Sequence, residues 1–450
     1  MLGLVSQLTN KTGIPFPLAN PEKAPKKAKV AALARVCDEL WWRRKVRTKQ
    51  WRELEALARE MGLVSLKRGA YVSDFTFKRR WLQKQENRAL LEALEAINEE
   101  GATYTLAELA DLSTSNPAIR RAEMMVRTRG FEEIAKHSTV AYQAMFYTIT
   151  CPSKFHSALH YGGANPKYQG STPREAQEYL NTQWQRARAA FGRKDIQPYG
   201  MRVTEPHHDG TPHWHLLLFI PANQAAQATE ILRHYALAED GDEPGAALRR
   251  FTAETIDPKK GSATGYIAKY ISKNIDGLGI DADSYGRDAK ESAIRIEAWA
   301  SVWGIRQFQQ IGGPSVTVWR ELRRLDSTAE DKDLLQRLVA AADSSDWEEY
   351  TRLMGGAICA RKARPLRPMM ITREALNKYG EAVKTLKGLL YGVERVATRV
   401  HEWTVRLVSQ NVSQATADAE VSAIQSDHIQ HMNPYLLAPP SNFAPLEFCQ

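Results

Sequence analysis

Two histidines at the start of a strongly apolar strand constrain the fold of this chain more than any other feature. In residues 212–220, His213, Trp214 and His215 are followed by an unbroken apolar run. Side chains two residues apart share one face of a β-strand, so the two imidazoles project together while Trp214 points the other way. The pattern predicts a strand with one face in a hydrophobic core and both histidines at the start of the opposite face.

This pair of histidines is typical of a metal site built on a rigid element. Two imidazoles that project from one strand offer two nitrogen ligands at a fixed separation. The structural alternative is that His213 and His215 are partly buried polar side chains, each hydrogen-bonded to a neighbour. A third ligand is expected from Glu205, which ends the preceding predicted strand, residues 199–205.

The turn between these two strands decides whether Glu205 reaches the histidines. A two-residue turn at Asp209-Gly210 pairs Glu205 with Trp214, on the wrong face. A three-residue turn or one bulge pairs Glu205 with His215, and His207 is then the substitute ligand. Two imidazoles and one carboxylate suit Mn²⁺, while Mg²⁺ prefers oxygen ligands but is more abundant in cells, and this ligand set does not exclude zinc.

Two tyrosines and two lysines form one stripe of a predicted helix at residues 266–274. They are Tyr266, Lys269, Tyr270 and Lys273. Isoleucines form a separate stripe, which is the expected core face. A tyrosine pair one turn apart is often only structural, but these two share their face with lysines and lie away from the apolar stripe.

We interpret these tyrosines as nucleophiles that attack a phosphodiester. A phenol is a poor nucleophile at neutral pH and needs a cation or base nearby to favour the phenolate. A divalent ion stabilises the charge that builds on the phosphate oxygens, and the lysines add positive charge around the phosphate. The expected catalytic residues are therefore Tyr266, Tyr270 and Lys269, and Lys273 is expected to bind DNA.

The composition favours a polyanionic partner. The formal net charge is +9 and the pI is about 9.2, which favours nucleic acid over a membrane surface. The four cysteines are dispersed and form no CxxC pair, so we interpret them as reduced thiols. No apolar run reaches the ~18 residues of a membrane span and no secretion signal is evident, so we expect a cytoplasmic protein that does not bind membranes.

The order of elements predicts an α+β chain with helical regions on both sides of a central domain. The expected parts are a flexible basic leader (1–29), a helical N-terminal region (30–138), the central domain (139–327), a helical C-terminal region (328–432) and a disordered tail (433–450). We further expect one helix that contains Leu94 and Ile97, another that ends at Gly130, and a strand at residues 316–319.

A basic and aromatic segment, residues 41–52, lies in the N-terminal region. It holds six basic residues, three tryptophans and no acidic residue. Such a mixture suits single-stranded DNA through phosphate neutralisation and base stacking, so Trp42, Arg43 and Arg44 are candidate DNA-binding residues. The alternative is a helix with its tryptophans in a core and a solvated basic face.

The chain resembles the bacteriophage replication gene A protein family, whose members are HUH endonucleases that initiate rolling-circle replication. The resemblance covers residues 71–325 and rests mainly on EPHHDGTPHWH at 205–215 and YIAKY at 266–270. It implies that His213 and His215 bind the divalent metal and that Tyr266 and Tyr270 are the nucleophiles. It also implies a central HUH-type antiparallel five-stranded sheet with flanking helices.

The resemblance further implies a nick at a replication origin, a 5′-phosphotyrosine link and later rejoining of the strand. The tyrosines follow the histidines in the chain, as in replication initiators rather than conjugative relaxases. No GxxxxGK[ST] phosphate loop is present, so a host helicase is expected to unwind the DNA that the host polymerase copies. Two alternatives remain, namely a transposase or relaxase that acts on other mobile DNA and a non-catalytic origin-binding protein with structural histidines.

Overall fold

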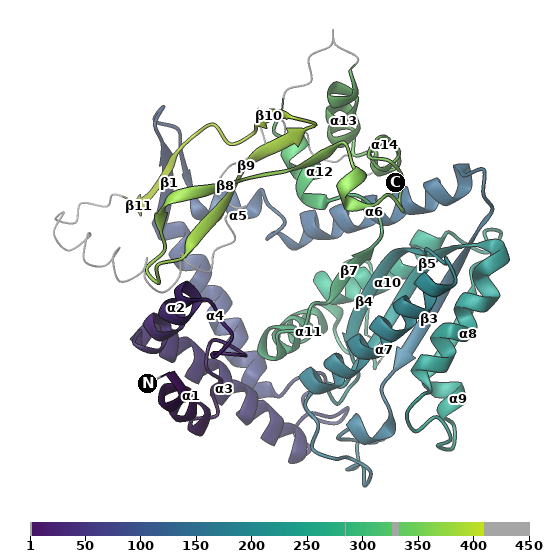
Figure 1. Ribbon diagram of the computed structural model, residues 1–450. Coiled ribbons are helices and arrows are strands. Elements are labelled where there is room, and N and C mark those ends of the chain that lie inside the picture. The colour runs from purple at the N-terminus through teal and green to yellow at the C-terminus, as the bar shows by residue number, and fades with distance from the viewer. Residues whose placement is uncertain (1, 284, 326–332, 409–450) are drawn as a thin grey trace. The chain divides into compact units, whose positions relative to one another are not determined.

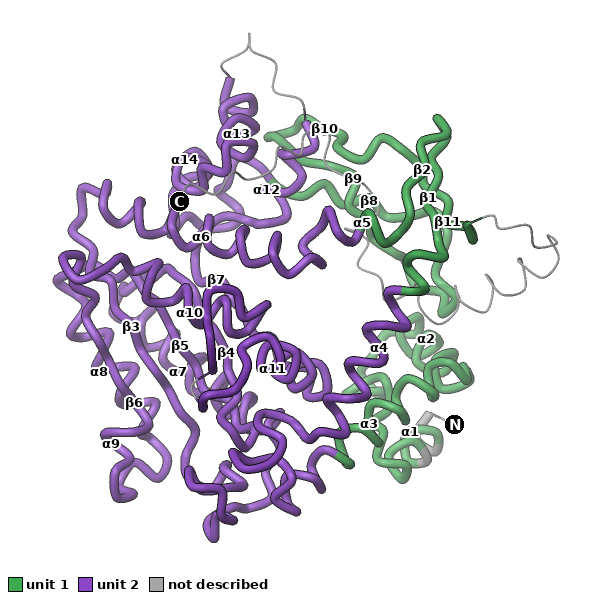
Figure 2. The backbone as a smooth tube through the Cα atoms, turned by 180° about the vertical axis from the view of Figure 1, so that it is seen from behind, with its two compact units in different colours: residues 1–54, 89–109, 367–438 green, residues 55–88, 110–366, 439–450 purple. Residues whose placement is uncertain are grey.

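The computed structural model describes residues 2–283, 285–325 and 333–408 (Figure 1). Its mixed helices and strands confirm the α+β class. The chain divides into two compact units (Figure 2). Unit 1 contains residues 1–54, 89–109 and 367–438, and unit 2 contains residues 55–88, 110–366 and 439–450. The tail that was predicted to be disordered, residues 433–450, lies outside the described residues.

A five-stranded sheet forms the centre of unit 2, with the strand order β6-β3-β5-β4-β7. The strands are β3 (Tyr142–Thr150), β4 (Tyr199–Pro206), β5 (Pro212–Pro221), β6 (Phe251–Thr255) and β7 (Phe308–Ile311). Each neighbouring pair is antiparallel. The five-stranded antiparallel sheet that the family resemblance implied is therefore confirmed.

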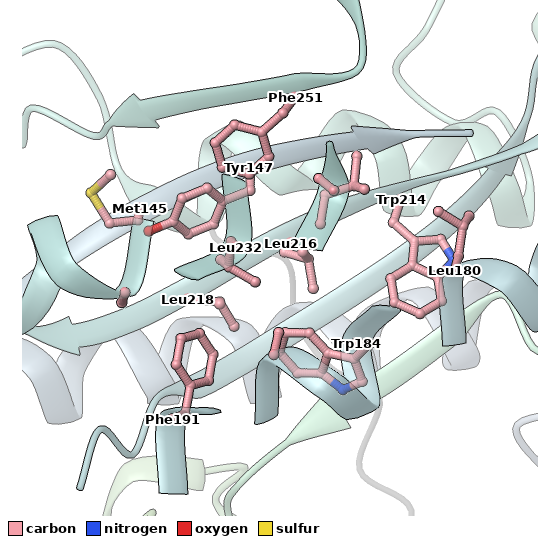
Figure 3. Close-up of a cluster of buried hydrophobic side chains, with 14 of the residues drawn as sticks. Met145, Tyr147, Leu180, Trp184, Phe191, Trp214, Leu216, Leu218, Leu232 and Phe251 are labelled. Carbon is pink, nitrogen blue, oxygen red and sulfur yellow. The ribbon is translucent and has the colours of Figure 1, made fainter. Parts of the chain in front are cut away.

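Two helices cover one face of this sheet and form a hydrophobic core with it (Figure 3). They are α7 (Pro173–Arg193) and α8 (Ala225–Ala236). Trp214, Leu216 and Leu218 project from β5 into this core, as the two-residue alternation predicted. Helix α7 begins at a capping box of Thr172 and Glu175, which gives hydrogen-bond partners to backbone groups of the first turn.

The opposite face of the sheet carries the two histidines and packs against three other helices. They are α6 (Pro117–His137), α10 (Ala263–Ile275) and α11 (Ala289–Trp303). Ile267 and Ile271 are buried on α10, so the isoleucine stripe is its core face, as predicted. The tyrosine helix is thereby packed on the sheet face that carries His213 and His215.

Gly130 lies inside α6, although the sequence pattern predicted that a helix ends there. A Cβ atom at this position would lie 2.6 Å from the Cβ atom of Trp347, so the glycine lets the indole pack directly on the helix backbone. We expect Gly130→Ala to destabilise the protein by about 1–3 kcal/mol, although alanine normally stabilises a helix interior. The matched control is Gly192→Ala in α7, where an added Cβ atom would meet no atom within 4 Å other than its chain neighbours and its own helix backbone. Here we expect the free energy of unfolding to rise by about 0.5 kcal/mol. Urea unfolding measures both changes, and a stabilised Gly130→Ala variant would contradict this packing.

Unit 2 also contains short helices. They are α9 (Ala246–Arg249), α12 (Val316–Leu322), α13 (Leu334–Asp343), α14 (Trp347–Leu353) and the 3-10 helices η1 (Ser153–Phe155), η2 (Ala222–Gln224) and η3 (Arg361–Ala363). The strand predicted at residues 316–319 is wrong, because α12 forms there. Trp319 is buried and packs on the rings of Trp347 and Tyr350, so tertiary packing selects a helix from a short apolar run that allows either structure.

Unit 1 is built from helices and two three-stranded sheets, with the orders β11-β1-β2 and β10-β9-β8. Its helices are α1 (Leu2–Lys11), α2 (Lys26–Val36) and the parts of α3 (Glu39–Glu60), α4 (Asp74–Ala93) and α5 (Leu106–Asp111) that fall within its bounds. Its strands are β1 (Leu94–Asn98), β2 (Thr103–Thr105), β8 (Leu366–Leu376), β9 (Ala382–Tyr391), β10 (Glu394–Ala397) and β11 (Trp403–Leu407). No helix among the described residues is long and apolar enough to cross a membrane.

The structure corrects parts of three expectations for the terminal regions. The C-terminal region was predicted to be helical, which holds for α13 and α14, but residues 366–407 form β8 to β11. Residues 371–376 of β8 are all exposed, so no buried face indicates a strand there. Leu94 and Ile97 lie in β1 rather than in a helix, because β1 pairs with β11 and Leu94 packs against Leu106. The leader, predicted to be flexible, contains helix α1 and the first residues of α2.

Candidate metal and tyrosine site

Glu205, His213 and His215 lie together on the sheet face opposite α7 and α8. The Nε2 atoms of the two histidines are 2.9 Å apart, and Glu205 Oε2 lies 3.8 Å from His213 Nε2 and 3.5 Å from His215 Nε2. Two donors bound to one ion at about 2.1 Å lie about 3.0 Å apart at a right angle and about 3.6 Å apart at 120°. These three side chains therefore fit one divalent cation.

The register of this hairpin differs from both turns considered for the sequence. Glu205 lies opposite His213, whereas the three-residue turn predicted that it lies opposite His215. The backbone N–H of His207 donates to the carbonyl of Thr211, so an odd number of residues closes the turn. Because the number of turn residues is odd, Glu205 stays on the sheet face that carries the histidines, as the three-residue turn predicted. Its partner on β5 is His213 rather than His215, a difference of two residues. The ring centre of His207 is 4.1 Å from that of His213, beside the ligand group.

Burial keeps His213 in the neutral form that binds a metal ion. Burial and the neighbouring His207 and His215 lower the pKa of His213 well below its ordinary value. His215 Nδ1 is 3.1 Å from the hydroxyl of Thr148 on β3, which orients the ring with Nε2 towards Glu205. Partners of this kind fix the tautomer of a metal-binding imidazole.

Helix α10 supplies the partners of the buried Glu205 carboxylate. Lys273 Nζ is 3.2 Å from Glu205 Oε2, and Asn274 Nδ2 donates to Oε1. Burial raises the pKa of the Glu205 carboxyl, but the charge of Lys273 and the neighbouring imidazole outweigh burial and set it at about 2. Lys273, predicted to bind DNA, is thus largely buried as a partner of Glu205. Asn274, which also donates to the carbonyl of Tyr270, was not predicted from the sequence.

The two tyrosines lie beside these ligands. The ring centre of Tyr270 is 3.9 Å from that of His215 and 5.4 Å from that of Phe146. Tyr266, one turn earlier, has its ring centre 6.3 Å from that of Phe146. Lys269 Nζ is 4.9 Å from the centre of the Tyr270 ring. Burial raises the pKa of Tyr270 to about 12, so the hydroxyl is protonated at neutral pH.

A buried carboxylate from α6 holds the N-terminus of the tyrosine helix. Glu132 accepts hydrogen bonds from the backbone N–H groups of Ala263 and Thr264 and from the Thr264 hydroxyl. The Ser262 hydroxyl accepts from the N–H of Gly265. A negative charge at this end complements the helix dipole. Glu132 was not predicted, because its partners lie more than 130 residues away and no local pattern reports them.

A buried network holds the loop between β4 and β5. The Asp209 carboxylate accepts hydrogen bonds of 2.8 Å from the N–H of Ser157 and from the Thr211 hydroxyl. Arg59 Nε donates to the Asp209 carbonyl at 2.8 Å, and its Nη2 lies 3.9 Å from the carboxylate. Trp299 donates to another carbonyl of the same loop. The two histidines therefore begin a strand whose preceding turn is fixed from several distant segments.

A second group of possible ligands, Glu133, His137 and Glu348, lies at the surface of unit 2. His137 Nδ1 is 2.7 Å from Glu348, and Lys136 Nζ is 3.0 Å from Glu133. Ion pairs of this kind account for the group without a metal ion.

The predicted DNA-binding segment of α3 belongs to unit 1. Trp42 Nε1 donates to the carbonyl of Val36 at 2.7 Å, and Trp41 is buried. Trp41 thus packs inside unit 1, in line with the alternative of core tryptophans, whereas Trp42 and Trp51 are half-buried. Arg43 is exposed and Arg44 is half-buried. DNA binding by Trp42, Arg43 and Arg44 stays a prediction.

The geometry defines an α+β protein in which a histidine and carboxylate group lies beside a pair of tyrosines on a helix. Residues 1–278 match the bacteriophage replication gene A protein (GPA) family. The chain belongs to this family, as the resemblance of its motifs indicated. No solved structure matches the chain.

Relatives of the chain are named for phage replication. It is 43% identical over 379 residues to a probable replication protein of Pseudoalteromonas phage PM2, covering 82% of this chain and 58% of the relative. It is 41% identical over 389 residues to the replication gene A protein of Escherichia phage 186, covering 83% and 56%. It is 36% identical over 408 residues to a probable replication endonuclease from a prophage-like region of Salmonella paratyphi A, covering 86% and 50%. The chain thus spans between half and three-fifths of the length of these relatives.

Proposed function

We propose that this protein initiates phage rolling-circle DNA replication as a metal-dependent nickase that uses a tyrosine nucleophile. The observation that carries the proposal is the Tyr270 ring, 3.9 Å from the ring of His215 in the Glu205, His213 and His215 group. A nucleophile and a set of cation ligands are thereby close enough to act on one phosphodiester. The relatives named as replication endonucleases support the same reading.

In this mechanism His213, His215 and Glu205 hold Mg²⁺ or Mn²⁺, which neutralises charge on the phosphate oxygens when bound. The hydroxyl oxygen of Tyr266 or Tyr270 attacks phosphorus, and Lys269 favours loss of the phenolic proton. The bond from phosphorus to the 3′ oxygen breaks, the 3′ oxygen takes up a proton, and the 5′ phosphate stays on the tyrosine.

The same chemistry runs backwards to close a circle. A phosphotyrosine ester conserves the energy of the broken bond, so a 3′-hydroxyl that attacks it rejoins the strand and frees the phenol. The free 3′ end left by the nick is the primer for the host polymerase. We assign unwinding to a host helicase and the whole reaction to the cytoplasm of the bacterial host.

Incubation with supercoiled phage origin DNA and Mg²⁺ or Mn²⁺ tests the proposal. The expected product is a nicked circle with the protein covalently attached to a 5′ end, stable to detergent and sensitive to protease. EDTA should prevent its formation. Unchanged DNA behaviour in EDTA would favour a non-catalytic origin-binding protein, and preference for a transposon end would favour a transposase or relaxase.

Asn274 gives a quantitative test of the metal site. Asn274→Ala removes the hydrogen bond that orients Glu205, so we expect Mn²⁺ affinity to fall by about tenfold. The matched control is Asn181→Ala on α7, on the other side of the sheet, which should leave the affinity unchanged. Isothermal titration calorimetry measures both, and equal affinities for the two variants would contradict the ligand set.

A further inference from the structure

Five arginines gather at the β7 edge of the sheet face that carries the histidines. They are Arg120, Arg127, Arg306, Arg320 and Arg323, here called the arginine cluster. The guanidinium carbon of Arg120 lies 5.2 Å from the ring centre of Phe308. Arg127 Nη1 is 3.4 Å from Gln310 Oε1, and Arg306 Nε donates to the Phe308 carbonyl at 3.1 Å. Side chains from α6 and from the segment before β7 thus meet over one edge strand.

Strand pairing gives the distance between this cluster and the metal ligands. His215 lies opposite Val203, and Val203 lies opposite Phe308, so these residues form one row on one face. Neighbouring strands are about 4.8 Å apart, so Phe308 lies about 10 Å from His215 across the sheet. That distance equals about three nucleotides of duplex rise.

The carboxylate of Glu123 is shared within the cluster. Arg320 binds Glu123 through two contacts of 2.8 Å, and Arg127 lies 3.7 Å from the same side chain. The Arg127 side chain is only 8% exposed. Burial lowers the pKa of Arg127, and the nearby Arg320, Arg306 and Arg120 lower it further. The charge of Glu123 raises this pKa but does not outweigh the other effects. Cations that are removed from water in this way favour an anion beside them.

Other carboxylates near the cluster are also shared. Glu297 attracts Arg120 electrostatically, but the Glu297 carboxylate also forms ion pairs with Arg80 at 2.8 Å and with Lys84 at 2.6 Å. Asp343 attracts Arg323 electrostatically, as Glu123 also does. Among the described residues, no ion pair joins Arg120 or Arg306 to a carboxylate, and both contact Phe308, which lies in the same row of the sheet as His215.

We propose that the arginine cluster binds backbone phosphates of the DNA strand within a few nucleotides of the scissile phosphate. This inference rests on the proposed function and adds a phosphate-binding surface to it. A guanidinium presents a planar fork of donors that fits phosphate oxygens. Contacts of this kind set the register of a strand without reading its bases.

The test is the affinity of an Arg120→Gln, Arg306→Gln double variant for a fluorescein-labelled oligothymidylate of about 20 nucleotides, long enough to fill a single-strand site. Fluorescence anisotropy without metal, over a series of salt concentrations, should show affinity reduced about tenfold per lost contact. The slope of log K against log salt should fall by about 0.7 per contact. Arg188→Gln, at an exposed position of α7 on the other side of the sheet, is the matched control and should bind as the wild type does.

Circular dichroism verifies that each variant is folded. If the double variant does not fold, the single variant Arg306→Gln replaces it, because the Arg306 side chain is exposed. Equal affinity and salt slope for the double variant and the Arg188→Gln control would overturn the inference. The covalent adduct assay separates it from the proposed function. If the wild type forms the adduct and the double variant binds DNA normally, only the inference about the arginine cluster is rejected. If the double variant binds DNA more weakly but the wild type forms no adduct, the cluster is supported and the nickase is rejected.

Discussion

A Tyr266→Phe, Tyr270→Phe double variant is expected to form no covalent DNA adduct and to nick origin DNA at least about 10³-fold more slowly than the wild type. Phenylalanine keeps the ring contacts of Tyr270 with His215 and Phe146, so the change removes only the hydroxyl oxygens that are proposed as nucleophiles. Transfer of an end-labelled strand to the protein, followed on a denaturing gel, measures both quantities.

The double tyrosine variant has a matched control on the other side of the sheet. Tyr235→Phe on α8 makes the same chemical change and should nick at the wild-type rate. The Mn²⁺ affinity of the double variant should also equal that of the wild type, because neither phenol is among the proposed ligands. Persistence of the adduct in the double variant would show that another side chain is the nucleophile.

Arg59→Ala is expected to lower the free energy of unfolding by about 3–5 kcal/mol, the largest stability effect proposed for this chain. The Arg59 side chain is 1% exposed and donates to the carbonyls of Asp209, Ser171 and Phe155. Its removal leaves those acceptors without this donor and leaves the buried Asp209 carboxylate without its guanidinium. Urea unfolding followed by far-ultraviolet circular dichroism measures the change.

Two further variants separate the buried charge from general effects of removing an arginine. Adding Asp209→Asn to Arg59→Ala should recover part of the lost stability, because the unpaired carboxylate is then neutral. Arg188→Ala, at an exposed position of α7, should change stability by no more than about 0.5 kcal/mol. A loss below about 1 kcal/mol for Arg59→Ala would mean that the loop before β5 does not depend on this network.

The elements nearest the candidate site were predictable because their patterns are local. Strand β5 begins with the alternation His-Trp-His and continues as an unbroken apolar run, and the isoleucine stripe of α10 has helical spacing. Each pattern identifies a core face and therefore also the opposite face, which carries His215 or Tyr270. Glu205 was chosen because an odd turn places it on the same sheet face as the histidines. A register error of two residues leaves it on that face, because side chains two residues apart point the same way.

Other parts of the fold depend on partners that no local pattern reports. Strand β6 has one buried residue, Phe251, and β7 is short and polar, so neither shows a strand pattern before its neighbour is known. Strand β1 depends on pairing with β11, more than 300 residues away. Glu132 and Asn274 were missed for the same reason, since each acts through contacts between elements that are distant in the chain.

The tyrosine helix is anchored near both ends, by Glu132 at its first turn and by Asn274 at its last. Its two phenols are four residues apart, which is about 6 Å along the helix axis. In the proposed mechanism, exchange between the two attacking oxygens then requires the DNA strand to advance by about that length while one of its ends stays attached to the protein. The pace of circle closure would then follow the slack in the displaced strand rather than any rearrangement of the polypeptide.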